Sequence, residues 1–218
     1  KVDTNNNDMH VSKYNSSGTV QWQRRLYTTG NDNGRGVFCD SSSNVYVGGE
    51  YYDTGISQYG AFVAKYNSSG TIQWQRKLTV GLSYAIRSDS YNCIWGDSSG
   101  NVYWVGRHNP SGNDIIFIAK WNSSGTIQWQ RSLSTPNGCN GWGVSVDSTG
   151  AVLVTGYRGN AYGQILKLPA DGSKTGSYTI NGNTWTYAAT SYTEAAASAT
   201  DAATTLSATS IGLTDSAY

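Results

Sequence analysis

The residues whose types could carry acid–base, nucleophilic or metal chemistry are few and scattered in this sequence. There are two histidines, His10 and His108, and no H-x-x-x-H, G-x-S-x-G or C-x-x-C pattern occurs. Acid–base or nucleophilic catalysis needs a histidine, a paired carboxylate or a Cys–His set. The two histidines stand at different positions within their repeat units, so they do not form a recurring site. We therefore expect a protein that is not an enzyme and that uses no metal and no cofactor.

The three cysteines are Cys39, Cys93 and Cys139. Their spacing matches no metal motif, and an odd number leaves at least one thiol outside any disulfide. We interpret them as small buried or half-buried thiols, with a disulfide pair plus one free cysteine as the alternative.

One twelve-residue phrase occurs three times, as KYNSSGTVQWQR at 13–24, KYNSSGTIQWQR at 65–76 and KWNSSGTIQWQR at 120–131. Chemistry rarely needs three copies of a site, whereas a fold built by stacking equal units needs a copy in each unit. Residues 71–78 alternate between apolar and polar faces, which is typical of a half-buried strand. The phrase therefore indicates architecture, and the tryptophans at its centre are predicted to pack between units. They are Trp22, Trp74 and Trp129.

A second recurring element is a turn of the type D-S-S-G-N between two apolar runs, found at 36–49, 93–106 and 143–156. Its carboxylates are Asp40, Asp97 and Asp147, which we expect to cap the turn, since calcium binding would need more acidic ligands close by. The N-S-S sequons at Asn15 and its two equivalents, Asn67 and Asn122, also fit turns; glycosylation is the alternative reading. Each full unit thus contains four strands and three turns.

The lysine of the phrase recurs at 13, 65, 120 and 167, so the units are 52, 55 and 47 residues apart. Four-stranded units of this length are typical of propeller blades. The run D-S-S-G-N-V-Y-V-G followed by F-V-A-K-Y-N-S-S-G-T-I-Q-W resembles the SBBP-type β-propeller repeat of bacterial surface and secreted proteins and of phage virion proteins. The resemblance covers roughly residues 9–172. It implies an all-β fold of antiparallel blades and says almost nothing about activity.

The predicted propeller region is 1–187, with a half blade at 9–26 and blades at 34–78, 91–133 and 141–187, the last ending in a divergent strand within 173–188. Since a closed ring normally has at least four blades, we expect further blades upstream. An open arc, or blades shared between chains, is the alternative.

Residues 188–218 are dominated by Ala, Thr and Ser. T-E-A-A (193–196) and T-D-A-A (200–203) lie seven residues apart, and T-D-S-A follows at 214–217. The spacing suggests a helical bundle seam, and the composition suggests a polar linker. Such runs resemble the fibrous segments of bacteriophage tail-fibre and virion proteins.

Charge argues against nucleic acid as a partner, and the distribution of apolar residues argues against insertion into a membrane. Lys and Arg number 15 against 14 Asp and Glu, which gives a net charge of +1, and only 13% of residues are charged. We therefore expect no nucleic-acid binding. No apolar stretch approaches 18 residues, so we expect no membrane insertion.

Function is expected where the copies of the unit differ. The variable loops lie on one face and carry an aromatic and cationic set suited to a glycan or a partner protein. Its members are Tyr51, Tyr52, Tyr59, Arg107, His108, Trp142, Tyr157 and Arg158. We expect a non-enzymatic structural or adhesive virion component, homo-oligomeric or bound to other virion proteins. The alternative is a secreted or cell-surface bacterial interaction module, and a propeller lyase or hydrolase is a third possibility.

Overall fold

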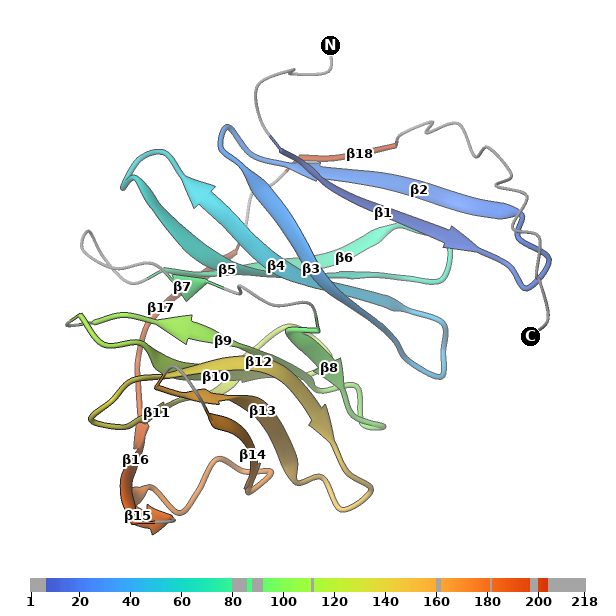
Figure 1. Cartoon of the computed structure of the whole chain (residues 1–218). Coiled ribbons are helices and arrows are strands. Elements are labelled where there is room, and N and C mark those ends of the chain that lie inside the picture. The colour runs from blue at the N-terminus through green and yellow to red at the C-terminus, as the bar shows by residue number, and fades with distance from the viewer. Residues whose placement is uncertain are drawn as a thin grey trace, which may run out of the picture.

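The computed structural model describes residues 7–79, 86–87, 92–110, 112–159, 162–180, 182–196 and 200–203. Within these residues every regular element is a strand, and none is a helix that could span a membrane. The prediction of an all-β, antiparallel fold is confirmed. The strands form four open sheets (Figure 1).

The four sheets follow the chain order of the repeat. The first sheet contains β1 (Met9–Tyr14) and β2 (Val20–Tyr27); the second contains β3 (Asp32–Cys39), β4 (Val45–Asp53), β5 (Gln58–Tyr66) and β6 (Ile72–Thr79). The third contains β7 (Ile86–Arg87), β8 (Ile94–Gly96), β9 (Val102–His108), β10 (Ile115–Trp121) and β11 (Ile127–Ser134). The fourth contains β12 (Cys139–Val146), β13 (Val152–Arg158) and β14 (Tyr162–Leu168).

The recurring turns close hairpins through side chains placed by the repeat. The Asn67 Oδ1 atom accepts the backbone N–H groups of Ser69 and Thr71, and Gly70 adopts a φ of 78° that favours glycine. In the other turn, the Asp97 carboxylate accepts the N–H groups of Ser99 and Asn101. The aspartates that we singled out therefore hold turns, as do the sequon asparagines.

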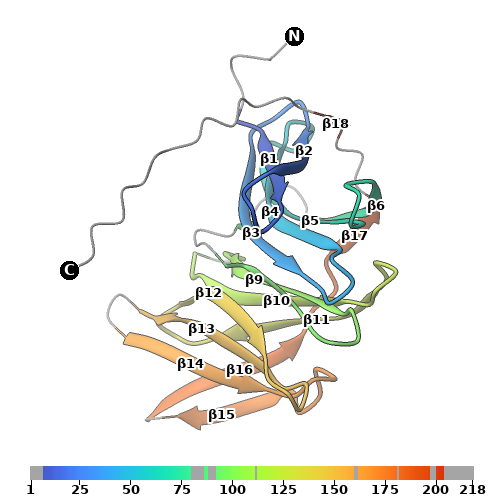
Figure 2. The same ribbon diagram turned by 90° about the vertical axis from the view of Figure 1, so that its right-hand side faces the viewer.

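The sheets lie one against the next (Figure 2). The core consists of three apolar layers, one between each pair of successive sheets. The layer between the first and second sheets includes Met9, Leu26 and Phe62. The layer between the second and third sheets is centred on Trp104 and Phe117. Since each sheet buries both faces only when it has two neighbours, stacking is what stabilises the units.

The outward faces of the end sheets are more polar than the faces between sheets. His10 and Ser12 of β1 occupy the positions that Phe62 and Ala64 hold in β5, where the two apolar side chains are buried. On the fourth sheet, Thr155 takes the place of the buried Val105 and is exposed. These substitutions allow water to reach both end faces.

The chain leaves the repeat order after the fourth sheet. β15 (Gly176–Ile180) pairs with β16 (Asn183–Ala189), and β16 adds to β11 of the third sheet instead of to β14. The sequence places residues 173–188 in the unit of β12 to β14, so the structure differs from that expectation. β17 (Thr193–Ala196) then adds to β6, and β18 (Thr200–Ala203) adds to β2 (Figure 1).

The strands β16, β17 and β18 together form what we call the strap. Its register repeats: Arg131 pairs with Ala189, Arg76 with Ala196, and Arg24 with Ala203, at steps of seven residues. The spacing that suggested a helical seam therefore belongs to strands, one on each of three sheets. The third copy of the motif, at 214–217, lies outside the described residues.

Candidate functional site

The lysine, tryptophan and arginine of the repeated phrase bind the next unit, and we call these three contacts the clasp. Trp74 Nε1 donates to the Ser123 carbonyl at 3.1 Å, Lys65 Nζ donates to the same oxygen at 3.4 Å, and Arg76 Nε donates to the Gly125 carbonyl at 2.6 Å. The same three contacts join the first sheet to the second, and the third to the fourth. Trp22 and Trp129 are buried, and Trp74 is half-buried. These three residues and Asp40, Asp97 and Asp147 are therefore structural parts of the stack.

The eight candidate ligand-binding residues do not converge on one site. Tyr51 is buried between the first and second sheets, and His108 is buried against Tyr192, with its Nδ1 atom 2.5 Å from the tyrosine hydroxyl. Burial lowers the pKa of His108 to about 4. Neither side chain is placed to meet a ligand at the surface.

The remaining candidates form local pairs. Tyr52 and Tyr59 meet edge to face at a centroid distance of 5.0 Å. Arg107 forms an ion pair with Asp114 at 3.0 Å. Arg158 donates to the Asn183 side chain at 2.8 Å, and therefore joins β13 to the β15–β16 hairpin.

Trp142 and Tyr157 form the most accessible aromatic pair of this set. Their ring centroids are 5.0 Å apart at an interplanar angle of 50°, and Trp142 is 45% exposed. Trp142 sits at a bulge between Gly141 and Gly143, which turns its side chain out of the regular strand alternation. Of the eight tryptophans, all of which lie in the described residues, the others are buried or half-buried.

The bulge position has equivalents that sequence inspection did not select. Arg35 stands at the same kind of bulge in β3, and Asn92 precedes β8. The Asn92 N–H donates to the Arg35 carbonyl at 2.9 Å, and the Val144 N–H donates to the Asn92 carbonyl at 3.4 Å. Arg35, Asn92 and Trp142 therefore form a row across three sheets. Aligning the residue five places before each turn aspartate would have revealed it.

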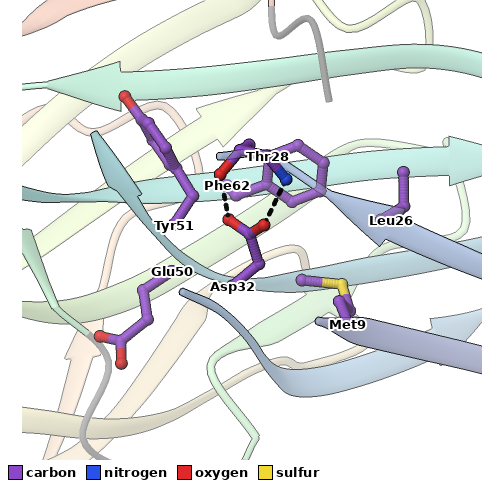
Figure 3. Close-up of a pocket in the computed structure, with 7 residues that line it drawn as sticks. All are labelled: Met9, Leu26, Thr28, Asp32, Glu50, Tyr51 and Phe62. Carbon is purple, nitrogen blue, oxygen red and sulfur yellow. Dashed lines mark hydrogen bonds between the residues drawn. The ribbon is translucent and has the colours of Figure 1, made fainter. Parts of the chain in front are cut away.

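The Asp32 carboxylate lies beside a small cavity that sequence inspection also missed, whereas the Glu50 carboxylate points away from it (Figure 3). Asp32 accepts a hydrogen bond from the Thr28 hydroxyl at 3.0 Å, and Glu50 pairs with Arg35 at 3.0 Å. Burial raises the pKa of Asp32 to about 6. The cavity encloses about 10 Å³, which is room for about one water molecule. It is too small for an organic substrate.

Metal-binding geometry is not found in the part of the chain that the structure describes, since no three His, Cys, Asp or Glu side chains gather there. The cysteines in this part are free thiols, exposed at Cys39 and buried at Cys93 and Cys139.

No protein-family model matches the chain, and a search of curated proteins finds none that matches it. The four stacked antiparallel sheets are compatible with a propeller-like fold. The resemblance to the SBBP-type repeat and to phage proteins stays a prediction.

Proposed function

We propose that the chain is a non-enzymatic structural and adhesive module of a virion appendage such as a phage tail fibre, and that its loop face recognises host surface glycans. The observation that carries the adhesive part is the exposed Trp142 indole, which packs against the Tyr157 ring at a tilt of 50°. Aromatic rings with an apolar face and a polar edge are favoured where one side is packed and the other is wet.

The pair is held by a rigid scaffold. Gly141 and Gly143 flank Trp142, and an added Cβ atom at Gly141 would lie 2.7 Å from Val105. The adjoining row supplies the exposed Asn92 amide, a group that hydrogen-bonds to sugar hydroxyls. A platform of this kind is expected to bind without catalysis, because the buried Asp32 carboxylate lines a cavity with room for about one water molecule.

The structural part of the proposal is supported by the clasp and the strap. The clasp joins successive sheets through bonds to backbone carbonyls, and the strap adds a strand to each of three sheets. Links of both kinds suit a shaft that must resist pulling forces. Detecting the chain in purified virions by mass spectrometry would support this location. A chain found only in the culture medium or on bacterial cells would overturn it.

Glycan binding is tested by screening the full chain on a glycan array, followed by fluorescence titration with the best glycan. Trp142→Ala should weaken binding at least about tenfold, equivalent to about 1.4 kcal/mol. The matched control is Tyr14→Ala, because Tyr14 is 48% exposed on the first sheet, far from the pair. Equal losses in the two variants, or no glycan bound by the wild type, would refute the role of the pair.

A further inference from the structure

The fourth sheet ends differently from the other three. β1, β5 and β10 each pair with an outer strand, namely β2, β6 and β11. Among the described residues no strand pairs with the corresponding edge of β14, because β15 and β16 join the third sheet. Seven residues, Tyr162–Leu168, therefore present an open strand edge.

A groove of about 670 Å³ follows this edge. One wall is β14, and the floor is the β15–β16 hairpin with Trp185 and Tyr187. Tyr178 and Ile180 also line it and are 44% and 39% exposed. An open strand edge beside an apolar floor is suited to an added extended strand, with main-chain hydrogen bonds on one side and side-chain contacts beneath.

We propose that residues 204–218 of a second copy of this chain bind in the groove as a strand. The residues just before this segment already bind by strand addition, at β17 and β18. Within the segment, Ile211 and Leu213 alternate with polar or small residues, as a strand with one apolar face requires. Its only charged side chain is Asp215, whereas the charged residues that line the groove are Lys167 and Lys174.

Chain length favours the second copy over the same chain. β18 ends at Ala203 on the first sheet, and β14 lies on the fourth. Sheets pack about 10 Å apart and an extended chain advances about 3.3 Å per residue, so crossing the stack takes about nine residues. If the segment belonged to the same chain, Ile211 would fall within the stretch needed to cross the stack and could not reach the groove. A second copy has no such limit.

Sedimentation velocity of the full chain over a concentration series tests the proposal, and no glycan is needed. The wild type should associate, and the double variant Ile211→Lys/Leu213→Lys should stay monomeric. The control Ser210→Lys/Thr214→Lys carries the same charge on the alternate face and should still associate. A labelled peptide of residues 204–218 should bind the monomeric variant, at least about tenfold more weakly when Tyr178→Lys and Ile180→Lys are added.

Association that persists in the Ile211→Lys/Leu213→Lys variant would overturn the proposal, as would a peptide that binds equally well with and without the two groove substitutions. A wild-type chain that is monomeric at all concentrations and excludes the peptide would show that its own segment occupies the groove, which would overturn the assignment to a second copy. Failure of glycan binding leaves each of these outcomes unchanged.

Discussion

Glu194 and Trp121 are joined by a hydrogen bond between the strap and the third sheet, with the indole Nε1 donating to the carboxylate Oε1 at 3.1 Å. The same oxygen lies 3.4 Å from Nε of Arg76, which belongs to the second sheet. Although β17 pairs only with β6, this one carboxylate contacts two sheets. The strap therefore adds a side-chain link to the clasp that already joins them.

Replacing Glu194 by alanine should destabilise the fold. The Trp121 indole N–H is buried and would lose its acceptor, and hydrogen bonds to charged groups contribute about 1.5–3 kcal/mol. We expect a loss of about 1–3 kcal/mol in urea unfolding, and a smaller loss for Glu194→Gln, which keeps an acceptor. Hydrogen exchange should become faster in β6 and β17. A Glu194→Ala chain as stable as the wild type would show that the strap is not held by this contact.

The contribution of the clasp to stability can be measured by comparing substitutions at two glycines that have the same backbone conformation. Gly125 and Gly18 both have a φ of 77°, but an added Cβ atom would lie 2.7 Å from Trp74 at Gly125 and would meet nothing within 4 Å at Gly18. Gly18→Ala should cost about 1–2 kcal/mol from backbone strain alone. Gly125→Ala should cost a further 1–3 kcal/mol or so, because the indole must move. Equal free energies of unfolding for the two variants would mean that the tryptophan contact does not matter.

The sequence predicted the elements that repeat and missed those that do not. The recurrence of Lys65 and its equivalents at intervals of 52, 55 and 47 residues was enough to infer stacked antiparallel units, since each copy makes the same local turn. The strap could not be found this way, because β17 and β18 are only four residues long and rich in Ala and Thr, and they are specified by pairing partners more than 50 residues away. The ligand candidates Tyr51 and His108 were selected from loop position alone, and packing between sheets buries them.

Asp32 should make the protein less stable as pH rises from about 4 to 6. Burial raises the pKa of Asp32 in the folded state from 3.8 to about 6, so in this interval the folded chain binds more protons than the unfolded chain. Comparing urea unfolding of the wild type with that of Asp32→Asn at pH 4, 5, 6 and 7 isolates this contribution. The variant should gain stability relative to the wild type toward pH 7. An unchanged difference across the series would refute the shift.

His108 should have the opposite effect over an overlapping interval. Burial lowers the pKa of His108 from 6.5 to about 4, so the unfolded chain binds more protons between these values and stability falls as pH falls. His108 contacts Tyr192, the residue before β17, so acid should loosen the strap first. Hydrogen exchange of β17 at pH 4.5 and 7 measures this, with His108→Gln as the variant that should lose the pH response. Equal pH responses in both chains would contradict it.

The Arg35–Glu50 pair should be among the most sensitive contacts of the second sheet. Arg35 Nη2 lies 3.0 Å from Glu50 Oε1, and the Glu50 side chain is fully buried, with Asn33 donating to the same oxygen at 3.2 Å. Removing one partner leaves a buried charge without its counterion, which costs about 3–5 kcal/mol. Arg35→Met should therefore lower the free energy of unfolding by about that amount, and adding Glu50→Gln should recover part of it because the buried group is then neutral. If the double variant were no more stable than Arg35→Met alone, the loss would come from packing of the arginine stem and not from the ion pair.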